Sequence, residues 1–164
     1  MEFIIRPFRP GEEKYVANLH ERLYSNEYGW GPGFIDYAKA IALEFPERRK
    51  PPKDELWVAE TSDGELVGSV MLCATDDPEV GRLRLFAVEK HCRRQGIGSA
   101  LMAKLFEQAR EIGFKKLILW TAAPLEAAIR GYERAGFQVV ESSENTNWCT
   151  DGSSITEIKM EMTL

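Results

Sequence analysis

A glycine loop flanked by arginines is the segment of this chain best suited to chemistry. Residues 93–99 read RRQGIGS, and a helical pattern of apolar residues follows over 97–112. The start of a helix leaves backbone N–H groups unpaired and carries a partial positive charge. The two glycines let an anion approach the backbone closely, and the two arginines add forked donors that suit phosphate oxygens. The loop therefore predicts a cradle for a diphosphate, with a plain tight turn as the alternative.

Two familiar phosphate-binding loops do not match this segment. It has no Gly-Lys-Ser/Thr ending, which the P-loop of nucleotide hydrolases requires. It also lacks a third glycine at the spacing of the dinucleotide-binding fingerprint, and it lies in the middle of the chain.

Two further side chains, Tyr132 and Arg84, can each be interpreted as structural or as functional. Tyr132 continues an apolar helix face that includes Leu125 and Ala128, so it is either a core residue or a proton donor at a site. Arg84 sits inside an apolar strand, where an unpaired charge is costly. It either pairs with a carboxylate of the protein, or faces a cleft and meets a carboxylate on a substrate.

The elements that must position these residues follow from periodicity and from Gly and Pro breaks. Helices are expected at 11–27, 34–45 (ended by Pro46), 97–112 and 125–135. Strands are expected at 3–6, 56–59, 66–72, 83–88, 117–120, 137–140 and 155–162, with 141–153 as a polar loop. The strand at 117–120 is apolar on both faces, which is typical of a central, parallel strand.

Composition narrows the class of protein. The chain has 164 residues, enough for one domain with a core, and a net charge of −5 that argues against a nucleic-acid surface. No apolar run is long enough to span a bilayer, so no membrane partner is expected. The three cysteines have no metal-ligand spacing, so no metal site is expected. They read as free thiols of a reducing compartment, and we expect a cytoplasmic protein.

The combined motifs resemble the GNAT acetyltransferase superfamily. The family's loop pattern, Gln/Arg-x-x-Gly-x-Gly/Ala, matches RRQGIG at 93–98. Its later signature matches Ala128, Tyr132, Gly136 and Phe137, and the order of strands and helices fits over about the whole chain. More narrowly, LYSNEYGW and RLRLFAVE resemble the acetyltransferase half of bacterial proteins fused to a MarR-type DNA-binding domain. This sequence has no such domain, so we expect a stand-alone relative.

The resemblance implies a fold and a co-substrate. The fold would be an α/β (α+β) single GNAT domain over residues 1–164. Its mixed, mostly antiparallel sheet would have six to seven strands with one splayed strand pair, flanked by about four helices. The co-substrate would be acetyl-CoA. Its pantetheine arm would contact the main chain of Phe86, Ala87 and Val88, and its diphosphate the N–H groups of Gln95, Gly96, Ile97, Gly98 and Ser99, with Arg93 and Arg94 as auxiliary contacts.

The resemblance also implies the reaction. Tyr132 would be the catalytic acid that protonates the departing thiolate. A general base, Glu27 or His20, would act on the amine, although both residues are expected at the surface. Glu27, Tyr28 and Trp30, between the first two helices, would line the acceptor site. Arg84 keeps the two alternatives given above: if it faces the cleft rather than pairing within the protein, it would bind an acceptor carboxylate.

The resemblance has gaps as well. Many family members carry an asparagine at the position of Leu125, so Thr121 becomes a substitute polar contact to the co-substrate. Cys92, beside the loop, is expected to be a packing residue rather than a covalent relay.

The predicted function is transfer of an acetyl group from acetyl-CoA to a primary amine of a small, amino acid-like molecule. The alternatives are a protein or peptide N-acetyltransferase and a non-catalytic acyl-CoA sensor. A homodimer stays open, since dimers are common in the family.

Overall fold

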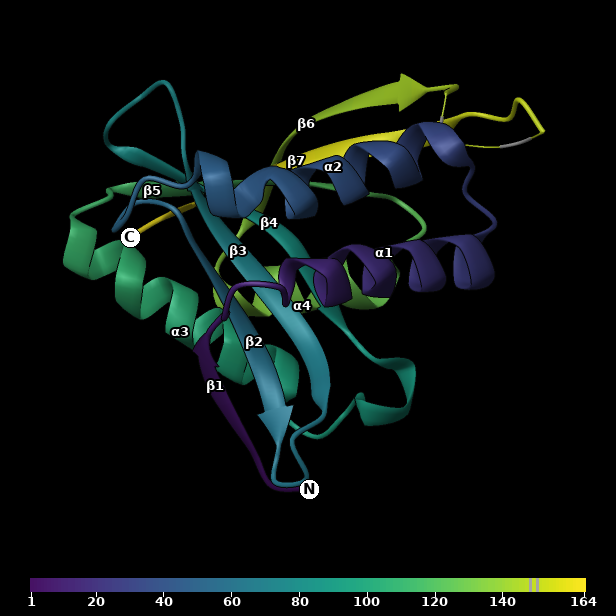
Figure 1. Ribbon diagram of the computed structural model, residues 1–164. Coiled ribbons are helices and arrows are strands. Elements are labelled where there is room, and N and C mark those ends of the chain that lie inside the picture. Colours follow the sequence, from purple (N-terminus) through teal and green to yellow (C-terminus); the bar gives the residue numbers. More distant parts are fainter. Residues whose placement is uncertain (148, 150) are drawn as a thin grey trace.

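Seven strands form one sheet in the computed structural model, which describes residues 1–147, 149 and 151–164. The strands lie in the order β1-β2-β3-β4-β5-β7-β6 (Figure 1). Their bounds are β1 Phe3–Pro7, β2 Glu55–Thr61, β3 Leu66–Ala74, β4 Val80–Val88, β5 Lys116–Ala122, β6 Gln138–Asn145 and β7 Ile155–Thr163. Every neighbouring pair is antiparallel except β4 and β5, which run parallel.

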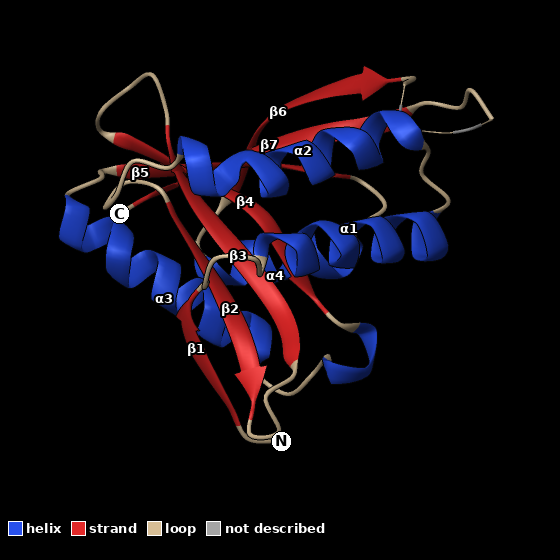
Figure 2. Cartoon of the chain, viewed as in Figure 1, coloured by secondary structure: helices blue, strands red, loops and turns tan. Residues whose placement is uncertain are grey.

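Helices cover both faces of the sheet (Figure 2). Within the described residues the α-helices are α1 Glu13–Tyr28, α2 Pro32–Arg48, α3 Ile97–Ile112 and α4 Glu126–Ala135. Helices α1 and α2 lie on one face and pack against strands β2 and β3 through residues such as Val16, Ala42 and Met71. Helices α3 and α4 lie on the other face, where Leu101, Leu105 and Tyr132 join the largest apolar core. The predicted fold class, with its mixed, mostly antiparallel sheet and four helices, is confirmed.

Most element boundaries differ from the sequence prediction by a few residues, and two of the differences have a clear physical reason. Pro46 does not end α2: the helix continues to Arg48, and the N–H of Arg49 still reaches the carbonyl oxygen of Phe45 at 2.9 Å. Proline removes one donor near the end of the helix, and there the chain tolerates the loss. Strand β6 extends to Asn145, into the segment expected to be a loop. It is almost wholly exposed along its length, so it lacks the apolar alternation that marks a half-buried strand.

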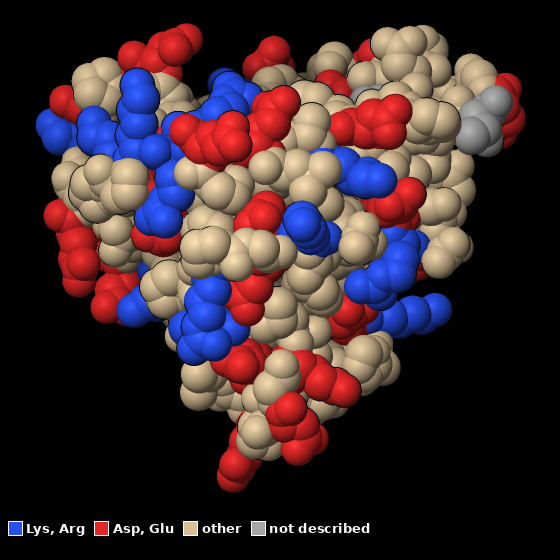
Figure 3. Space-filling model, viewed as in Figure 1, with Lys and Arg blue, Asp and Glu red and all other residues tan. Residues whose placement is uncertain are grey.

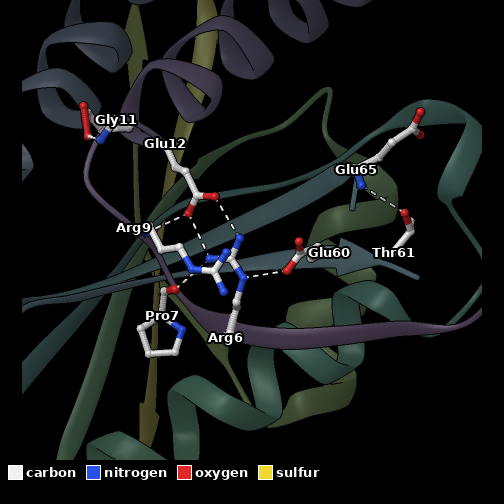
Figure 4. Close-up of polar contacts among 9 residues, drawn as sticks. Arg6, Pro7, Arg9, Gly11, Glu12, Glu60, Thr61 and Glu65 are labelled. Atoms are coloured by element: carbon white, nitrogen blue, oxygen red, sulfur yellow. Dashed lines mark hydrogen bonds and ion pairs between the residues drawn. The ribbon is translucent and has the colours of Figure 1, made fainter. Parts of the chain in front are cut away.

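An arginine cluster fixes the entry into α1 (Figure 4). The guanidinium of Arg6, on β1, donates to both carboxylate oxygens of Glu12 at 2.9 and 2.8 Å and to Glu60 on β2 at 2.7 Å. The same Glu12 carboxylate accepts from the N–H of Arg9 at 2.6 Å. The start of α1 is thereby joined to the first two strands, and α1 carries residues of the site described next.

The described residues offer neither a metal site nor a membrane-spanning helix. No group of His, Cys, Asp or Glu side chains among them could hold a metal ion. None of the helices in that part of the chain is long and apolar enough to cross a membrane. Cys73, Cys92 and Cys149 are free thiols, and Cys92 is fully buried, as expected of a packing residue.

Candidate active site

Strands β4 and β5 pair at one end only and then part. Their hydrogen-bonded register covers Val80, Gly81 and Arg82 against residues 116–118. Beyond it, β4 remains paired with β3 on its other side. Backbone groups of β4 over 84–88 therefore have no β5 partner, which is the splayed pair that the family resemblance implied.

A β-bulge in β4 accompanies the parting of the strands. The register between β3 and β4 shifts between Ser69 and Met71, and Leu85 has a φ of 48°, in the left-handed region. The hydroxyl of buried Ser69 donates to the Leu85 carbonyl oxygen at 3.0 Å and holds this conformation. Such backbone is costly for a leucine and is concentrated at functional sites.

A cavity of about 510 Å³ lies beside the parted strands. Its walls come from α1 and α2 on one side and from β4, β5, β7 and α4 on the other. The lining includes aromatic, charged and polar side chains from these elements: His20, Trp30, Tyr37, Arg82, Arg84, Phe86, Thr121, Leu125, Tyr132 and Glu157. The cavity is therefore a meeting point of segments that are far apart in the sequence.

The glycine loop leads into α3 without a side-chain cap. Gly96 is the N-cap and has a φ of 83°, which glycine adopts without strain. The first backbone bond of the helix runs from the N–H of Ala100 to the Gly96 carbonyl oxygen at 3.0 Å, so the N–H groups of residues 97–99 lie in the first turn without an intrahelical acceptor. A Cβ at Gly98 would stand 3.1 Å from the ring of Phe86. The loop is thus open to a diphosphate, and the fit to the phosphates of acetyl-CoA is good.

Arg93, in the glycine loop, forms an ion pair with Glu27, in the last turn of α1. The guanidinium donates to both carboxylate oxygens at 2.7 and 3.0 Å and also to the Val88 carbonyl oxygen at 3.3 Å. The hydrogen bond from Arg93 lowers the pKa of Glu27, which keeps the carboxylate charged. The pair joins the end of α1 to the glycine loop.

The phenol of Tyr132 lies at the cavity wall and is only 6% exposed. Its ring contacts those of Phe86 and Phe137 at centroid distances of 6.0 and 5.9 Å. Burial raises the pKa of Tyr132, so the phenol keeps its proton at neutral pH. Its chemistry in this cavity is that of a proton or hydrogen-bond donor.

His20 differs from the expectation that it lies at the surface. It is 2% exposed, and its Nδ1 lies 2.8 Å from the Val16 carbonyl oxygen. Nδ1 is therefore the protonated nitrogen, and Nε2 carries a lone pair. Within the described residues, Nε2 is buried without a hydrogen-bond partner. Burial lowers the pKa of His20 to about 4, so the ring is neutral at pH 7 and its Nε2 keeps an unused lone pair within the described structure.

Arg84 and its neighbour Arg82 line the same cavity from β4. Arg84 donates to the hydroxyl of Tyr37 at 2.7 Å, and its guanidinium lies 5.7 Å from the centre of that ring. Of the two fates expected for Arg84, it faces the cleft, and it forms no ion pair with a carboxylate among the residues that the structure describes.

The other acceptor-site candidates divide into two groups. Trp30 lines the cavity, as do Thr121 and Leu125. Tyr28 is not part of the lining; its ring lies 5.2 Å from that of Trp30. The sequence reasoning missed Arg82, Tyr37 and Glu157. For Arg82 a signal was present, because residues two apart in a strand share a face and Arg84 had already been singled out.

The surface over α1 and α2 carries charges of both signs (Figure 3). Basic side chains gather at the upper left of this view, and acidic side chains lie between and around them. In its described part, this face has no continuous basic surface of the kind that nucleic-acid binding uses.

Comparison with known proteins identifies the family. The model of the acetyltransferase (GNAT) family matches residues 15–137, which include most of α1, the parted strands, the glycine loop and Tyr132. The chain belongs to the GNAT acetyltransferase family. Members of this family use acetyl-CoA, which agrees with the fit of the loop described above.

Individual relatives agree with this assignment. A probable N-acetyltransferase family 8 member 5 from Mus musculus is 41% identical over 86 residues, which cover 50% of this chain and 37% of that protein. An N-acetylaspartate synthetase from Danio rerio is 33% identical over 96 residues, covering 58% of this chain and 34% of that protein. The chain thus spans less than half the length of these curated relatives.

A solved structure shows the same fold over nearly the whole chain. The GNAT-family acetyltransferase from Staphylococcus aureus Mu50 superposes with a TM-score of 0.81 at 15% identity, and the match covers 99% of each chain. At this identity the likeness concerns the fold alone.

Proposed function

We propose that this protein transfers the acetyl group of acetyl-CoA to the primary amine of a small acceptor that carries a carboxylate. The observation that carries the proposal is one cavity lined by a protonated phenol, Tyr132, and by Arg84, an arginine without a carboxylate partner among the described residues. The N-acetylaspartate synthetase among the relatives acts, by its name, on an amino acid, which supports an acceptor of this kind.

The glycine loop and β4 hold the co-substrate in this proposal. The N–H groups of residues 95–99 bind the diphosphate, aided by the dipole of α3. Arg94 and Arg93 supply additional positive charge there, while Arg93 also keeps the loop joined to α1 through Glu27. Main-chain groups of Phe86, Ala87 and Val88 face the gap left by β5 and pair with the pantetheine arm. When bound there, acetyl-CoA supplies a thioester carbonyl at the opening between the strands.

Residues at the cavity wall serve the transfer itself. The acceptor amine must be neutral to attack the thioester carbonyl carbon. His20 is the candidate for orienting the amine, because its ring belongs to the cavity lining and its Nε2 lone pair has no hydrogen-bond partner among the described residues. Tyr132 donates its proton to the sulfur as the carbon–sulfur bond breaks and negative charge develops there. The proton that the nitrogen loses as the amide forms then returns to the Tyr132 oxygen, so the phenol is restored. Glu27 is the other candidate base, but its carboxylate already accepts both hydrogen bonds of Arg93.

Arg84 sets the class of acceptor. A guanidinium binds a carboxylate through two parallel hydrogen bonds. Its present partner, the Tyr37 hydroxyl, is neutral, so the positive charge of Arg84 is left for a ligand. The same proposal places Trp30 against the apolar part of the acceptor, with Tyr28 behind it.

The test is release of CoA thiol from acetyl-CoA in the presence of amino acids, polyamines, aminoglycosides or short peptides. Turnover with amino acids, and its loss in Arg84→Met, is expected. Turnover with peptides only would support the protein N-acetyltransferase instead. Binding of acetyl-CoA with no turnover on any acceptor would overturn the enzymatic proposal and favour the acyl-CoA sensor.

Three finer expectations belong with this proposal. The relation to the acetyltransferase half of MarR-type fusion proteins rests on LYSNEYGW and RLRLFAVE alone. The cytoplasmic location rests on the free thiols. A homodimer remains a prediction from the family.

A further inference from the structure

We propose that the acceptor carries two acidic groups rather than one, and that Arg82 binds the second. The inference rests on the proposed function, which gives the first acidic group to Arg84. Arg82 and Arg84 lie two residues apart on β4, so their side chains project from the same face, and both line the cavity.

The protein leaves this pair of cations without a counter-charge. The Tyr37 hydroxyl accepts from Arg84, and Arg82 faces the same hydroxyl. Across the described chain, no carboxylate forms an ion pair with either guanidinium, and the Nε of Arg82 is buried without any acceptor. Each guanidinium has five N–H donors, so most of the donors of the pair are available to a ligand.

Among the half-buried arginines of the described chain, Arg82 and Arg84 form no ion pair with a carboxylate, whereas Arg6 and Arg49 do. Arg6 pairs with Glu12 and Glu60, Arg49 with Glu55, and Arg93 with Glu27. The fold thus supplies carboxylates to arginines elsewhere. Two like charges placed side by side and half-buried destabilise the folded state, and burial together with Arg84 lowers the pKa of Arg82. Such an arrangement is typical of a binding site.

The cavity is also polarised along the sheet. Arg82 pairs with Ile118 of β5, whereas Glu157 pairs with Ala122, four residues further along the same strand. Four residues of strand span roughly 13 Å. Glu157, whose carboxylate accepts from Asn145 at 2.8 Å, therefore lies toward the opposite end from the arginine pair. A molecule with an amine at one end and two negative charges at the other fits this pattern, and a polyamine does not.

The shared chemistry is a dianionic amine, which includes dicarboxylic amino acids and phosphorylated or phosphonated amines. The first measurement uses amine-free probes, because they report on the arginine pair without turnover. Calorimetric titration compares succinate, a dianion, with butyrate, a monoanion of the same carbon number. We expect succinate to bind the wild type about 10- to 100-fold more tightly, the contribution of one charged hydrogen-bonded pair.

Variants separate the two arginines. Arg82→Met should abolish the preference for succinate while butyrate binding changes little, and Arg84→Met should weaken both probes. Arg82→Lys should restore part of the preference. Arg130→Met, an exposed arginine of α4, is the matched control and should behave as wild type. Equal affinities for succinate and butyrate in the wild type, or an unchanged preference in Arg82→Met, would overturn the proposal.

Thermal stability provides a second measurement, because the proposal and a purely structural role for Arg82 predict opposite changes in Tm. Because Arg82 has no carboxylate partner, Arg82→Met should keep or raise the Tm; a lower Tm would make Arg82 a structural residue and overturn the proposal. Turnover assays then test the second acidic group separately from the proposed acetyltransferase function. Aspartate or O-phosphoserine acetylated with higher kcat/KM than alanine supports both. Equal kcat/KM values for all three overturn the second acidic group only. Succinate preference without turnover on any amine supports the anion site and overturns the proposed function.

Discussion

Replacing His20 with phenylalanine should make the free energy of unfolding less sensitive to acid. The wild-type ring is neutral and almost fully buried, and its pKa is lowered to about 4 because burial disfavours the charged form. In an unfolded chain a histidine has its ordinary pKa of about 6.5. Between these two values the unfolded chain binds a proton that the folded protein does not. The free energy of unfolding of the wild type therefore falls as the pH falls through this window.

The size of the effect follows from the two pKa values. Linkage with 6.5 and about 4 gives a loss of about 2 kcal/mol between pH 8 and pH 5, rising to about 3 kcal/mol below pH 4. His20→Phe has no such term. The difference in unfolding free energy between variant and wild type should therefore shift by about 2 kcal/mol in favour of the variant between pH 8 and pH 5. Any fixed change in packing caused by phenylalanine cancels in this comparison.

Urea denaturation at pH 8, 7, 6 and 5 measures the effect. Carboxylates titrate equally in both proteins, so the difference isolates His20. The chain has one other histidine, His91, which is exposed, and His91→Gln controls for loss of a histidine as such. A variant that loses stability in parallel with the wild type across this pH range would refute a neutral, buried His20.

Three further outcomes are expected. Tyr132→Phe should lower kcat by about 100-fold or more, as loss of a general acid does, with little change in the Kd of acetyl-CoA; an unchanged kcat would remove Tyr132 from the acid role. Gly98→Val should weaken acetyl-CoA binding measured by calorimetry, since a Cβ there already stands 3.1 Å from the Phe86 ring, whereas Gly131→Ala, with its nearest neighbour at 3.8 Å, should not. Glu27→Gln should leave the pH profile of kcat in place, because Arg93 holds the carboxylate; a collapse of kcat above neutral pH would make Glu27 the base.

Local signals predicted the part of the fold that binds the co-substrate. Helix α3 runs from Ile97 to Ile112, as its apolar spacing and flanking glycines indicated, and both Gly96 and Gly113 have left-handed φ values. These signals are reliable because cap geometry and apolar periodicity are properties of neighbouring residues. The order of elements along the chain also followed from periodicity, whereas the parting of β4 from β5 came from the resemblance to a family, since no local pattern encodes it.

Contacts between distant segments were not predictable in the same way. Glu27 was considered as a base and Arg93 as a phosphate ligand, yet they lie 66 residues apart in the sequence and bind each other. Strand β6 offers the same lesson. Its residues QVVESSEN carry a weak strand pattern because the strand is exposed at the sheet edge, and pairing with β7 determines its conformation.

At the acceptor end of the cavity, individual residues could be recognised in the sequence, but the site that they form together could not. The run VGRLRLFAV places two arginines at alternate positions of one strand, which is readable as a charged face. Whether that face is solvated, paired or a binding site depends on what packs over it. Here α2 brings Tyr37, a neutral partner, and β7 brings Glu157 to the far end of the cavity. The positive charge of β4 is therefore left unbalanced inside a cavity that also contains the phenol of Tyr132, and it is this combination of segments that points to an anionic acceptor.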